Sequence, residues 1–245
     1  MKIAVFSDVH SNYEALKGVL EDIKLFKPDK ILCLGDLVGY GASPNEVIEL
    51  IRENNITTIL GNYDEAVGFR KMVCGCDYKN EEEARMGEIS LSWTSENINP
   101  ENREFLKTLK RQMKIEVEGL KILAVHGSPE RINEYLYEDV SADRIEKYFE
   151  ENDVDIILCG HTHIPYIRHV KGKFLINPGS VGKPKPEMGK KRFCPDATWI
   201  YMEINSDDFI FKIMKVPYDY EKSARLIEEK GLPKVFANLV RGITE

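Results

Sequence analysis

The chain contains short runs of apolar residues, most of which end directly in a polar cluster. Six of these runs have the length of a strand that is buried on both faces: Ile3–Phe6, Ile31–Leu34, Thr57–Leu60, Ile122–Val125, Ile156–Cys159 and Phe174–Ile176. Several of the segments between them have helical patterns with recognisable start signals. Strands that alternate with helices predict a fold of the α/β class.

Polar clusters mark the predicted helix starts at Ser11–Glu14, Ser43–Glu46, Asn99–Glu101 and Ser141–Asp143. The first two fit capping boxes, and Pro44 suits the first position of a helix. A last helix is predicted over residues 220–230. Residues 64–100 have the least regular pattern, and residues 66–98 could shape either a pocket or a subunit contact.

Two segments predict β-hairpins, over residues 114–125 and residues 198–216. The turn of the second hairpin is predicted at Asn205–Asp208. Hairpins place antiparallel strands beside parallel ones, so we predict mixed sheets and not a plain doubly wound sheet. A length of 245 residues is compatible with one domain, and we predict a single domain over residues 1–245.

The composition is that of a water-soluble globular protein, with 42% hydrophobic and 31% charged residues. No apolar run approaches the ~18–20 residues that span a bilayer, and the N-terminus becomes polar too early for a signal peptide. We therefore predict a cytoplasmic protein without a membrane partner. The five cysteines are mostly dispersed and odd in number, which favours free thiols over disulfides or zinc sites.

The net charge of −7 and the pI of about 5.4 disfavour extended nucleic-acid binding. A DNA nuclease would need a basic groove or an added DNA-binding domain. A small phosphorylated substrate, held by a local positive site, remains compatible with this charge. The basic loop over residues 182–192 is one candidate for such a site, although solvated surface loops often have this composition.

Side chains of metal-ligand type follow five of the apolar runs, at the point where each run ends. The carboxyl ends of parallel strands lie along one edge of a sheet, so these side chains should converge. They are Asp8, His10, Asp36, Asn62, His126, His161 and His163. An isolated aspartate after a strand is usually a helix cap. Four of the chain's five histidines share this placement, however, and only His169 lies outside it.

Carboxylate oxygens, an amide oxygen and imidazole nitrogens suit divalent cations such as Mn²⁺, Fe²⁺ and Zn²⁺. Seven ligands are too many for one tetrahedral ion but suit two ions that share a carboxylate, from either Asp8 or Asp36. We therefore predict two divalent metal ions as cofactors, with Mn²⁺ preferred and Fe, Zn, Ni or Co as alternatives.

The segments "DVH", "GDLVGYG", "GNYDEA", "VHGSP" and "GHTHIP", in this order, resemble the motifs of the calcineurin-like metallophosphoesterases. The segments "GDLVGYG", "LSWT…NREFLKTL" and "NPGSVG" look like those of its prokaryotic phosphodiesterase and diadenosine-tetraphosphatase-like branch. The resemblance covers about residues 1–205. It implies a four-layer α/β/β/α sandwich, in which two packed mixed sheets are flanked by helices.

The resemblance also implies a metal-dependent phosphoesterase in which a metal-bridging hydroxide attacks phosphorus. Asp8, His10 and His163 would hold one ion, Asn62, His126 and His161 the other, and Asp36 would bridge them. The implied catalytic residues are Asp36, Asn62, Asp64 and His126. Asp64 is expected to orient a ligand histidine such as His126.

Tyr63 stands where many relatives have a histidine that can protonate the leaving group. A tyrosine with a pKa near 10 is a poor proton donor at neutral pH, so we expect phosphodiesters and phosphoanhydrides with good leaving groups. The candidate substrate contacts are Tyr63, Ser180, Lys183, Lys185 and Arg192. A serine/threonine-type protein phosphatase, a phosphomonoesterase and a non-catalytic scaffold are the alternatives, and both a monomer and a homo-oligomer remain open.

Overall fold

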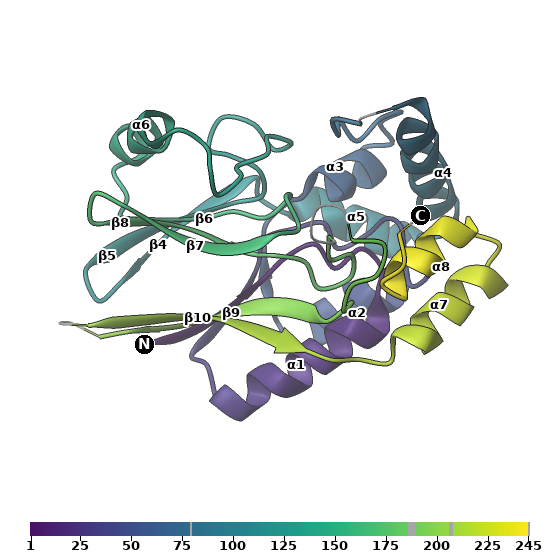
Figure 1. Ribbon diagram of the computed structural model, residues 1–245, viewed down its shortest axis with the longest axis horizontal. Coiled ribbons are helices and arrows are strands. Elements are labelled where there is room, and N and C mark those ends of the chain that lie inside the picture. Colours follow the sequence, from purple (N-terminus) through teal and green to yellow (C-terminus); the bar gives the residue numbers. More distant parts are fainter. Residues whose placement is uncertain (79, 186–189, 206–207, 245) are drawn as a thin grey trace.

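Two mixed β-sheets lie face to face at the centre of the molecule, as the computed structural model shows for residues 1–78, 80–185, 190–205 and 208–244 (Figure 1). In this part of the chain each sheet has five strands. The first has the order β10-β9-β1-β2-β3, with β1 at Lys2–Phe6, β2 at Lys30–Cys33, β3 at Thr57–Thr58, β9 at Ala197–Ile204 and β10 at Phe209–Val216. The second has the order β4-β5-β6-β8-β7, with β4 at Gln112–Val117, β5 at Leu120–Val125, β6 at Ile156–Leu158, β7 at Pro165–Val170 and β8 at Lys173–Pro178.

Both sheets combine parallel strands with a hairpin, as the sequence predicts. In the first sheet β1, β2 and β3 are parallel, while β9 and β10 form an antiparallel hairpin beside β1. In the second sheet β5, β6 and β8 are parallel, and β4 and β7 pair antiparallel at the two edges. Residues 206–207 of the predicted second turn lie outside the described residues.

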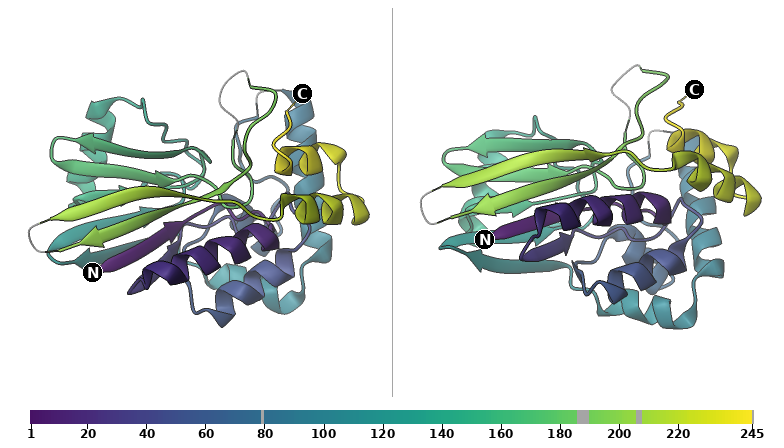
Figure 2. Two further views of the ribbon diagram at one scale, coloured as in Figure 1. Left: turned by 60° about the horizontal axis from the view of Figure 1, so that its bottom comes forward. Right: turned by 90° about the horizontal axis from the view of Figure 1, so that it is seen from below.

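The helices cover the outer faces of the two sheets and one end of the molecule (Figures 1 and 2). The first sheet is covered by α1 (Tyr13–Phe26) and α2 (Pro44–Glu53), and the second by α6 (Ala142–Asn152). The remaining helices are α3 (Asn62–Gly68), α4 (Glu81–Asn97), α5 (Pro100–Thr108), α7 (Tyr220–Glu229) and α8 (Lys234–Val240). Of these, α4, α7 and α8 lie at the end of the sheets away from the N-terminus. The expected α/β/β/α sandwich is confirmed.

Alternation along β1 explains how one short strand contributes to two cores. Ile3 and Val5 face the second sheet and pack with residues such as Ile122, while Ala4 and Phe6 face the helices α1 and α2. All four side chains are fully buried. A strand that is buried on both faces is apolar at every position, which is the pattern seen in the sequence.

The structure corrects several predictions about helices. The cap of α1 is Asn12, whose side chain accepts a hydrogen bond from the N–H of Ala15, and not Ser11. The segment 64–100 contains the long helix α4, whose buried positions include Gly87, Ser90 and Thr94. Because small and polar residues form much of its buried side, α4 lacks the apolar periodicity by which helices are found. The strand β7 and the helix α8 were also missed.

None of the helices in the described ranges is both long and apolar enough to cross a lipid bilayer. The five cysteines carry free thiols.

The core between the two sheets should be far more sensitive to truncation than the edge of the first sheet. Ile200 on β9 is fully buried between the sheets, and its cross-strand neighbour on β10, Ile213, is 38% exposed. Ile200→Ala should lower the free energy of unfolding by about 2–5 kcal/mol, because it leaves a cavity that cannot collapse. The matched variant Ile213→Ala should cost less than about 1 kcal/mol. Urea denaturation followed by circular dichroism measures both, and equal losses would contradict this core assignment.

Candidate metal centre

The candidate ligands lie where parallel strands end, and both sheets contribute. Asp8 and His10 follow β1, Asp36 follows β2, and Asn62 is the first residue of α3 after β3. His126 follows β5, whereas His161 and His163 follow β6. All seven side chains are buried, and the most exposed of them, His163, has an exposed fraction of only 6%. The two sheets therefore bring the seven predicted residues to one end of the sandwich.

Most of these residues have an uncommon backbone conformation. The φ angles of Asp8, His10, Asp36, His161 and His163 lie between 47° and 64°. This left-handed region costs a residue other than glycine about 1–3 kcal/mol, so it persists only where the surroundings enforce it. Here the N–H of Asp8 donates to Gly35 O and the N–H of His10 to Asp36 O, each at 3.0 Å. The two loops thus hold each other in the conformation that turns the side chains inward.

The side chains form two groups of possible metal ligands. One consists of Asp8, His10 and His163, and the other of Asp36, His126 and His161. Within each group the ligand atoms lie within 4.8 Å of one another. Asn62 belongs beside the second group, because its Oδ1 lies 3.0 Å from His126 Nε2. The first group has the residues expected for one ion, whereas the second holds Asp36 beside His126 and His161.

Hydrogen bonds to backbone carbonyls set the protonation of three of the histidine rings. Nδ1 of His10 lies 3.1 Å from Val38 O, Nδ1 of His126 lies 2.7 Å from Leu34 O, and Nδ1 of His163 lies 2.6 Å from Lys183 O. A carbonyl oxygen only accepts, so each Nδ1 carries the proton. In a neutral ring Nε2 then presents a lone pair to the centre, which is the state that binds a metal.

The arrangement fits a cation better than it fits a closed network of hydrogen bonds. Nε2 of His10 and Nε2 of His163 lie 3.1 Å apart, and Asp8 Oδ1 lies 3.2 Å from the latter. Asp8 Oδ1 and His161 Nε2 are buried and have no hydrogen-bond partner in the described part of the chain. Lone pairs that face one another in a buried space repel, and a divalent cation removes that repulsion. The residues present therefore fit bound metal.

Comparison with known proteins agrees with this chemistry. Residues 1–197 match the model of the calcineurin-like phosphoesterase superfamily domain. The chain belongs to this superfamily. It is therefore a metal-dependent phosphoesterase, a hydrolase that acts on phosphate esters.

Individual relatives of this phosphoesterase match nearly its full length. An uncharacterized protein of Methanocaldococcus jannaschii is 38% identical over 249 residues, covering 95% of this chain and 94% of the relative. The crystal structure of a metallophosphoesterase from Sphaerobacter thermophilus is 29% identical with a TM-score of 0.74, covering 99% of this chain and 98% of that one. A hypothetical protein from Pyrococcus horikoshii OT3 shares the fold, with a TM-score of 0.81 at 22% identity over 98% of both chains.

Within the phosphoesterase, Asp36 belongs to the second ligand group and also faces the first. Its Oδ2 is 3.8 Å from His10 Nε2 and 3.4 Å from His126 Nε2, one in each group. Its Oδ1 accepts a hydrogen bond of 2.8 Å from the N–H of Tyr63. The carboxylate is thereby oriented with one oxygen toward the backbone and the other toward both groups.

Asp64 has a different role from the one predicted. Its Oδ1 accepts hydrogen bonds from the N–H groups of Leu37 and Val38, and its Oδ2 accepts one from Gly61 N–H. His126 is instead oriented by Leu34 O. Asp64 therefore fastens the loop after β2 to the start of α3. Burial, with the charge of Asp36 next in size, raises the pKa of Asp64 to about 7.

Tyr63 is not placed as a substrate contact. Only 1% of it is exposed, its ring meets the edge of His10, and its hydroxyl lies 3.4 Å from the Tyr78 hydroxyl. Burial, followed by the proximity of Tyr40, raises the pKa of Tyr63 well above its ordinary value. The Tyr63 ring therefore packs against the candidate ligand His10, and its hydroxyl lies beside that of Tyr78.

Two other candidate substrate residues also have structural roles. Ser180 is fully buried, and its hydroxyl donates to Asp8 O at 2.8 Å and accepts from Lys183 N–H at 2.8 Å. Arg192 lies on a segment whose backbone pairs with Ile243 near the C-terminus. The Ser180 hydroxyl is thus occupied by the backbone of Asp8 and Lys183. Residues 186–189 of the basic loop lie outside the described residues.

Lys183 and Lys185, in contrast, lie beside the centre. The Lys183 ammonium is 4.1 Å from the centre of the Tyr40 ring, and Tyr40 in turn packs on His10. The Lys185 ammonium is 5.3 Å from the centre of the Tyr135 ring. These two cations remain candidates for contact with a phosphate group.

Cys74, Cys76 and Tyr135 contact the candidate ligands but were missed by reasoning from the sequence. Asn62 Nδ2 donates to Cys74 O at 3.1 Å and to Cys76 Sγ at 3.3 Å, which turns its Oδ1 toward His126. The Tyr135 ring lies on His161, with 4.1 Å between ring centres. The close pair Cys74 and Cys76 was the available signal, but spacing alone does not tell which strand end a loop will reach.

Burial keeps two of the histidines neutral. Desolvation, with the neighbouring His163 next in size, lowers the pKa of His10 to about 3. Desolvation and the neighbouring His126 lower the pKa of His161 to about 3. Burial alone would lower the pKa of His126 too, but the carboxylates of Asp36 and Asp8 outweigh it and raise that pKa to about 10. A metal ion bound there replaces a proton.

Gly61 should be indispensable for metal binding, because Asp36 occupies the space of any side chain at this position. A Cβ on Gly61 would lie 2.1 Å from both N and Oδ1 of Asp36. Gly61→Ala should therefore displace the carboxylate and weaken Mn²⁺ binding by at least ~10-fold, as is typical when a residue that orients a metal ligand is lost.

Isothermal titration calorimetry of the metal-free protein measures this affinity. The matched control is Gly18→Ala in α1, whose Cβ would meet nothing closer than 3.5 Å. That change should leave Mn²⁺ affinity unaltered and stabilise the helix by up to about 1 kcal/mol. If Gly61→Ala bound Mn²⁺ with wild-type affinity, metal binding would not depend on the present position of Asp36.

Proposed function

We propose that the protein hydrolyses phosphodiesters or phosphoanhydrides with two divalent metal ions that share Asp36. The observation that carries this proposal is the position of Asp36 Oδ2, within 3.8 Å of Nε2 of His10 and 3.4 Å of Nε2 of His126. One carboxylate oxygen faces both ligand groups, while the second is held by Tyr63 N–H. A pair of ions that share a carboxylate is the arrangement which seven ligands of these types favour.

The ligand set also favours binding of an anionic phosphate group. Of the seven ligands only Asp8 and Asp36 carry a negative charge. Burial alone would raise the pKa of Asp36, but the nearby His126 and His10 outweigh it and hold that pKa below its usual value. The site thus retains a net positive charge when it holds two divalent cations, and this charge attracts phosphate. Imidazole nitrogen, carboxylate and amide oxygen suit Mn²⁺, which we propose as the metal, and also Fe²⁺, Zn²⁺, Ni²⁺ and Co²⁺.

Two divalent ions held by these residues would supply Lewis acidity toward the phosphoryl oxygens and would lower the pKa of the water molecule that attacks phosphorus. The chain's own residues hold the components in place. Three histidines are fixed by carbonyl oxygens, Asn62 is fixed by Cys74 O, and Asp64 fastens the loop that carries Asp36. Such preorganisation means that little rearrangement is needed when charge develops on the phosphate.

The surroundings of residue 63 support a preference for good leaving groups. A histidine at this position could donate a proton to the leaving oxygen, whereas the Tyr63 hydroxyl faces Tyr78 and burial raises its pKa. The leaving group must then depart as an anion. Aryl phosphodiesters and phosphoanhydrides meet this condition, and alkyl monoesters do not.

Asp36→Asn tests the proposal directly. The variant should bind fewer than two metal ions per chain and hydrolyse bis(p-nitrophenyl) phosphate at least ~100-fold more slowly, since even residues that only orient a ligand cost about 10- to 100-fold. Metal analysis after dialysis and release of p-nitrophenolate with added Mn²⁺ are the measurements. Asp143→Asn, on the exposed first turn of α6, is the matched control and should behave as wild type. Two ions and full activity in Asp36→Asn would refute the shared carboxylate.

Tyr63→Phe tests whether the tyrosine hydroxyl donates a proton. We expect kcat on bis(p-nitrophenyl) phosphate to change by less than about threefold, far below the ~10²–10⁴ that general acids contribute. The pH profile of kcat should also keep its shape. A ~100-fold loss with unchanged metal content would instead identify Tyr63 as a proton donor.

A further inference from the structure

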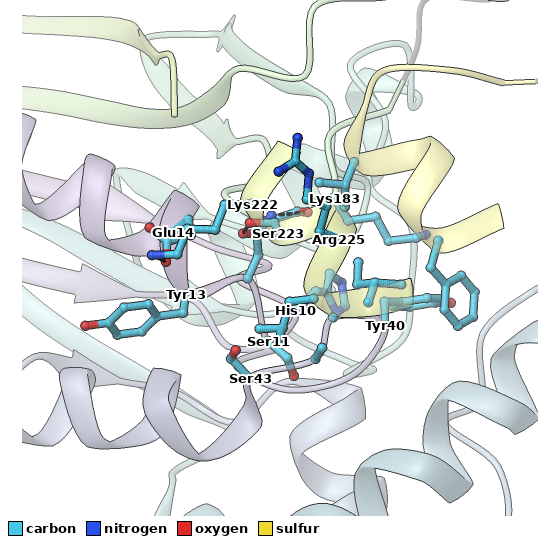
Figure 3. A pocket seen from close by; sticks show the side chains of 18 of the residues that line it. His10, Ser11, Tyr13, Glu14, Tyr40, Ser43, Lys183, Lys222, Ser223 and Arg225 are labelled. Atoms are coloured by element: carbon cyan, nitrogen blue, oxygen red, sulfur yellow. Dashed lines mark hydrogen bonds and ion pairs between the residues drawn. The ribbon is translucent and has the colours of Figure 1, made fainter. Parts of the chain in front are cut away.

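A cavity of about 500 Å³ adjoins the metal centre, between the main body of the fold and the last two helices (Figure 3). Its walls come from the start of α1, the loop after β2, Gly182 and Lys183, and the helices α7 and α8. We call it the C-terminal pocket. Its volume lies within the ~300–1,000 Å³ typical of small-molecule sites. The residues matched by the superfamily model end at 197, so α7 and α8 lie beyond the matched region.

The inner end of the C-terminal pocket touches the metal centre. His10 lines the pocket with its ring while its Nε2 belongs to the first ligand group. Lys183 lines it as well, and Lys183 O accepts the hydrogen bond that orients His163. The pocket and the metal centre therefore lie side by side, with His10 and Lys183 at the boundary between them.

Two polar groups at the inner end point to a ligand, a hydroxyl without a hydrogen-bond partner and an ammonium without a carboxylate in the part of the chain that the structure describes. Ser11 is only 2% exposed, and its hydroxyl has no hydrogen-bond partner among the described residues. The Lys183 ammonium lies over the Tyr40 ring, and no carboxylate in residues 1–78, 80–185, 190–205 and 208–244 forms an ion pair with it. A buried hydroxyl without a partner is costly unless a ligand engages it, and a half-buried cation without a carboxylate attracts an anionic group.

The outer part of the pocket is apolar along one wall and charged only at its rim. Phe236, Leu226 and Leu239 form the apolar wall, and the Phe236 ring meets the edge of Tyr40 at 5.3 Å between centres. The basic residues of the rim are already paired. Lys222 lies 2.7 Å from Glu14, and Arg225 lies 3.3 Å from Glu221. The rim therefore offers no free cation for a second phosphate group.

We propose that the C-terminal pocket binds the organic group of the substrate, and that this group is an uncharged ring system of nucleoside size. The proposal rests on the function proposed above. The phosphate end would meet Lys183 and Ser11, and the ring would lie against Phe236 and Leu226. Carboxylates at the rim, such as Glu229, can accept hydrogen bonds from sugar hydroxyls or base amino groups.

The test compares two diesters with the same leaving group, the p-nitrophenyl ester of thymidine 5′-monophosphate and methyl p-nitrophenyl phosphate. Both report the metal chemistry through release of p-nitrophenolate, and only the first has a group that fills the pocket. With Mn²⁺, the wild-type KM should be at least ~10-fold lower for the thymidine ester, a difference of about 1.4 kcal/mol.

Leu226→Trp and Leu239→Trp each place a large ring in the pocket from a half-buried position. Each should raise KM for the thymidine ester toward that of the methyl ester and leave kcat/KM for the methyl ester unchanged. The matched control is Val235→Trp, which adds the same ring to α8 at a side chain that is 43% exposed and outside the pocket lining. It should retain the wild-type preference.

Each outcome decides between the two proposals. Equal KM values for the two esters in the wild type, or an unchanged preference in both pocket variants, would overturn the assignment of the pocket and leave the proposed hydrolysis intact. No hydrolysis of either ester by the Mn²⁺-loaded wild type would overturn the proposed function, and the pocket assignment with it.

Discussion

The orientation of the Asp36 carboxylate is the constraint on which the site depends. One oxygen is held by Tyr63 N–H, and the other lies within 4 Å of a histidine from each ligand group. The residue has a φ of 55°, and only glycine fits at position 61, against it. Three segments therefore have to adopt mutually compatible conformations: the loop after β1, the loop after β2 and the start of α3. Burial by itself disfavours a charged carboxylate in this position, and the neighbouring His126 compensates for that cost.

The packing of the surrounding fold offsets the free-energy cost of holding the ligand loops in this conformation. Two sheets with an apolar interface and helices on their outer faces form a rigid support, and the ligand loops all emerge at one end of it. Backbone carbonyls orient the rings of His10, His126 and His163, so the ligand geometry follows from the backbone. Metal binding then stabilises the same loops that the strained conformations destabilise.

Much of this arrangement follows from the sequence, because it depends on local patterns. Apolar runs that end in Asp8, Asp36 or His126 identify both the parallel strands and the side chains at their ends. Features that depend on tertiary contacts could not be found in this way. The helix α4 buries Ser90 and Thr94 and has no clear apolar periodicity. Asp64 contacts backbone N–H groups of another loop, and Cys74 reaches Asn62 across a turn, neither of which spacing reveals.

The shared carboxylate is tested most directly by a crystal structure of the protein grown with Mn²⁺, with anomalous diffraction used to locate the metal. Two anomalous peaks about 3.5–4 Å apart are predicted, one among Asp8, His10 and His163 and one among Asn62, His126 and His161, with Asp36 bound to both. A single peak, or two peaks of which only one contacts Asp36, would contradict the shared carboxylate.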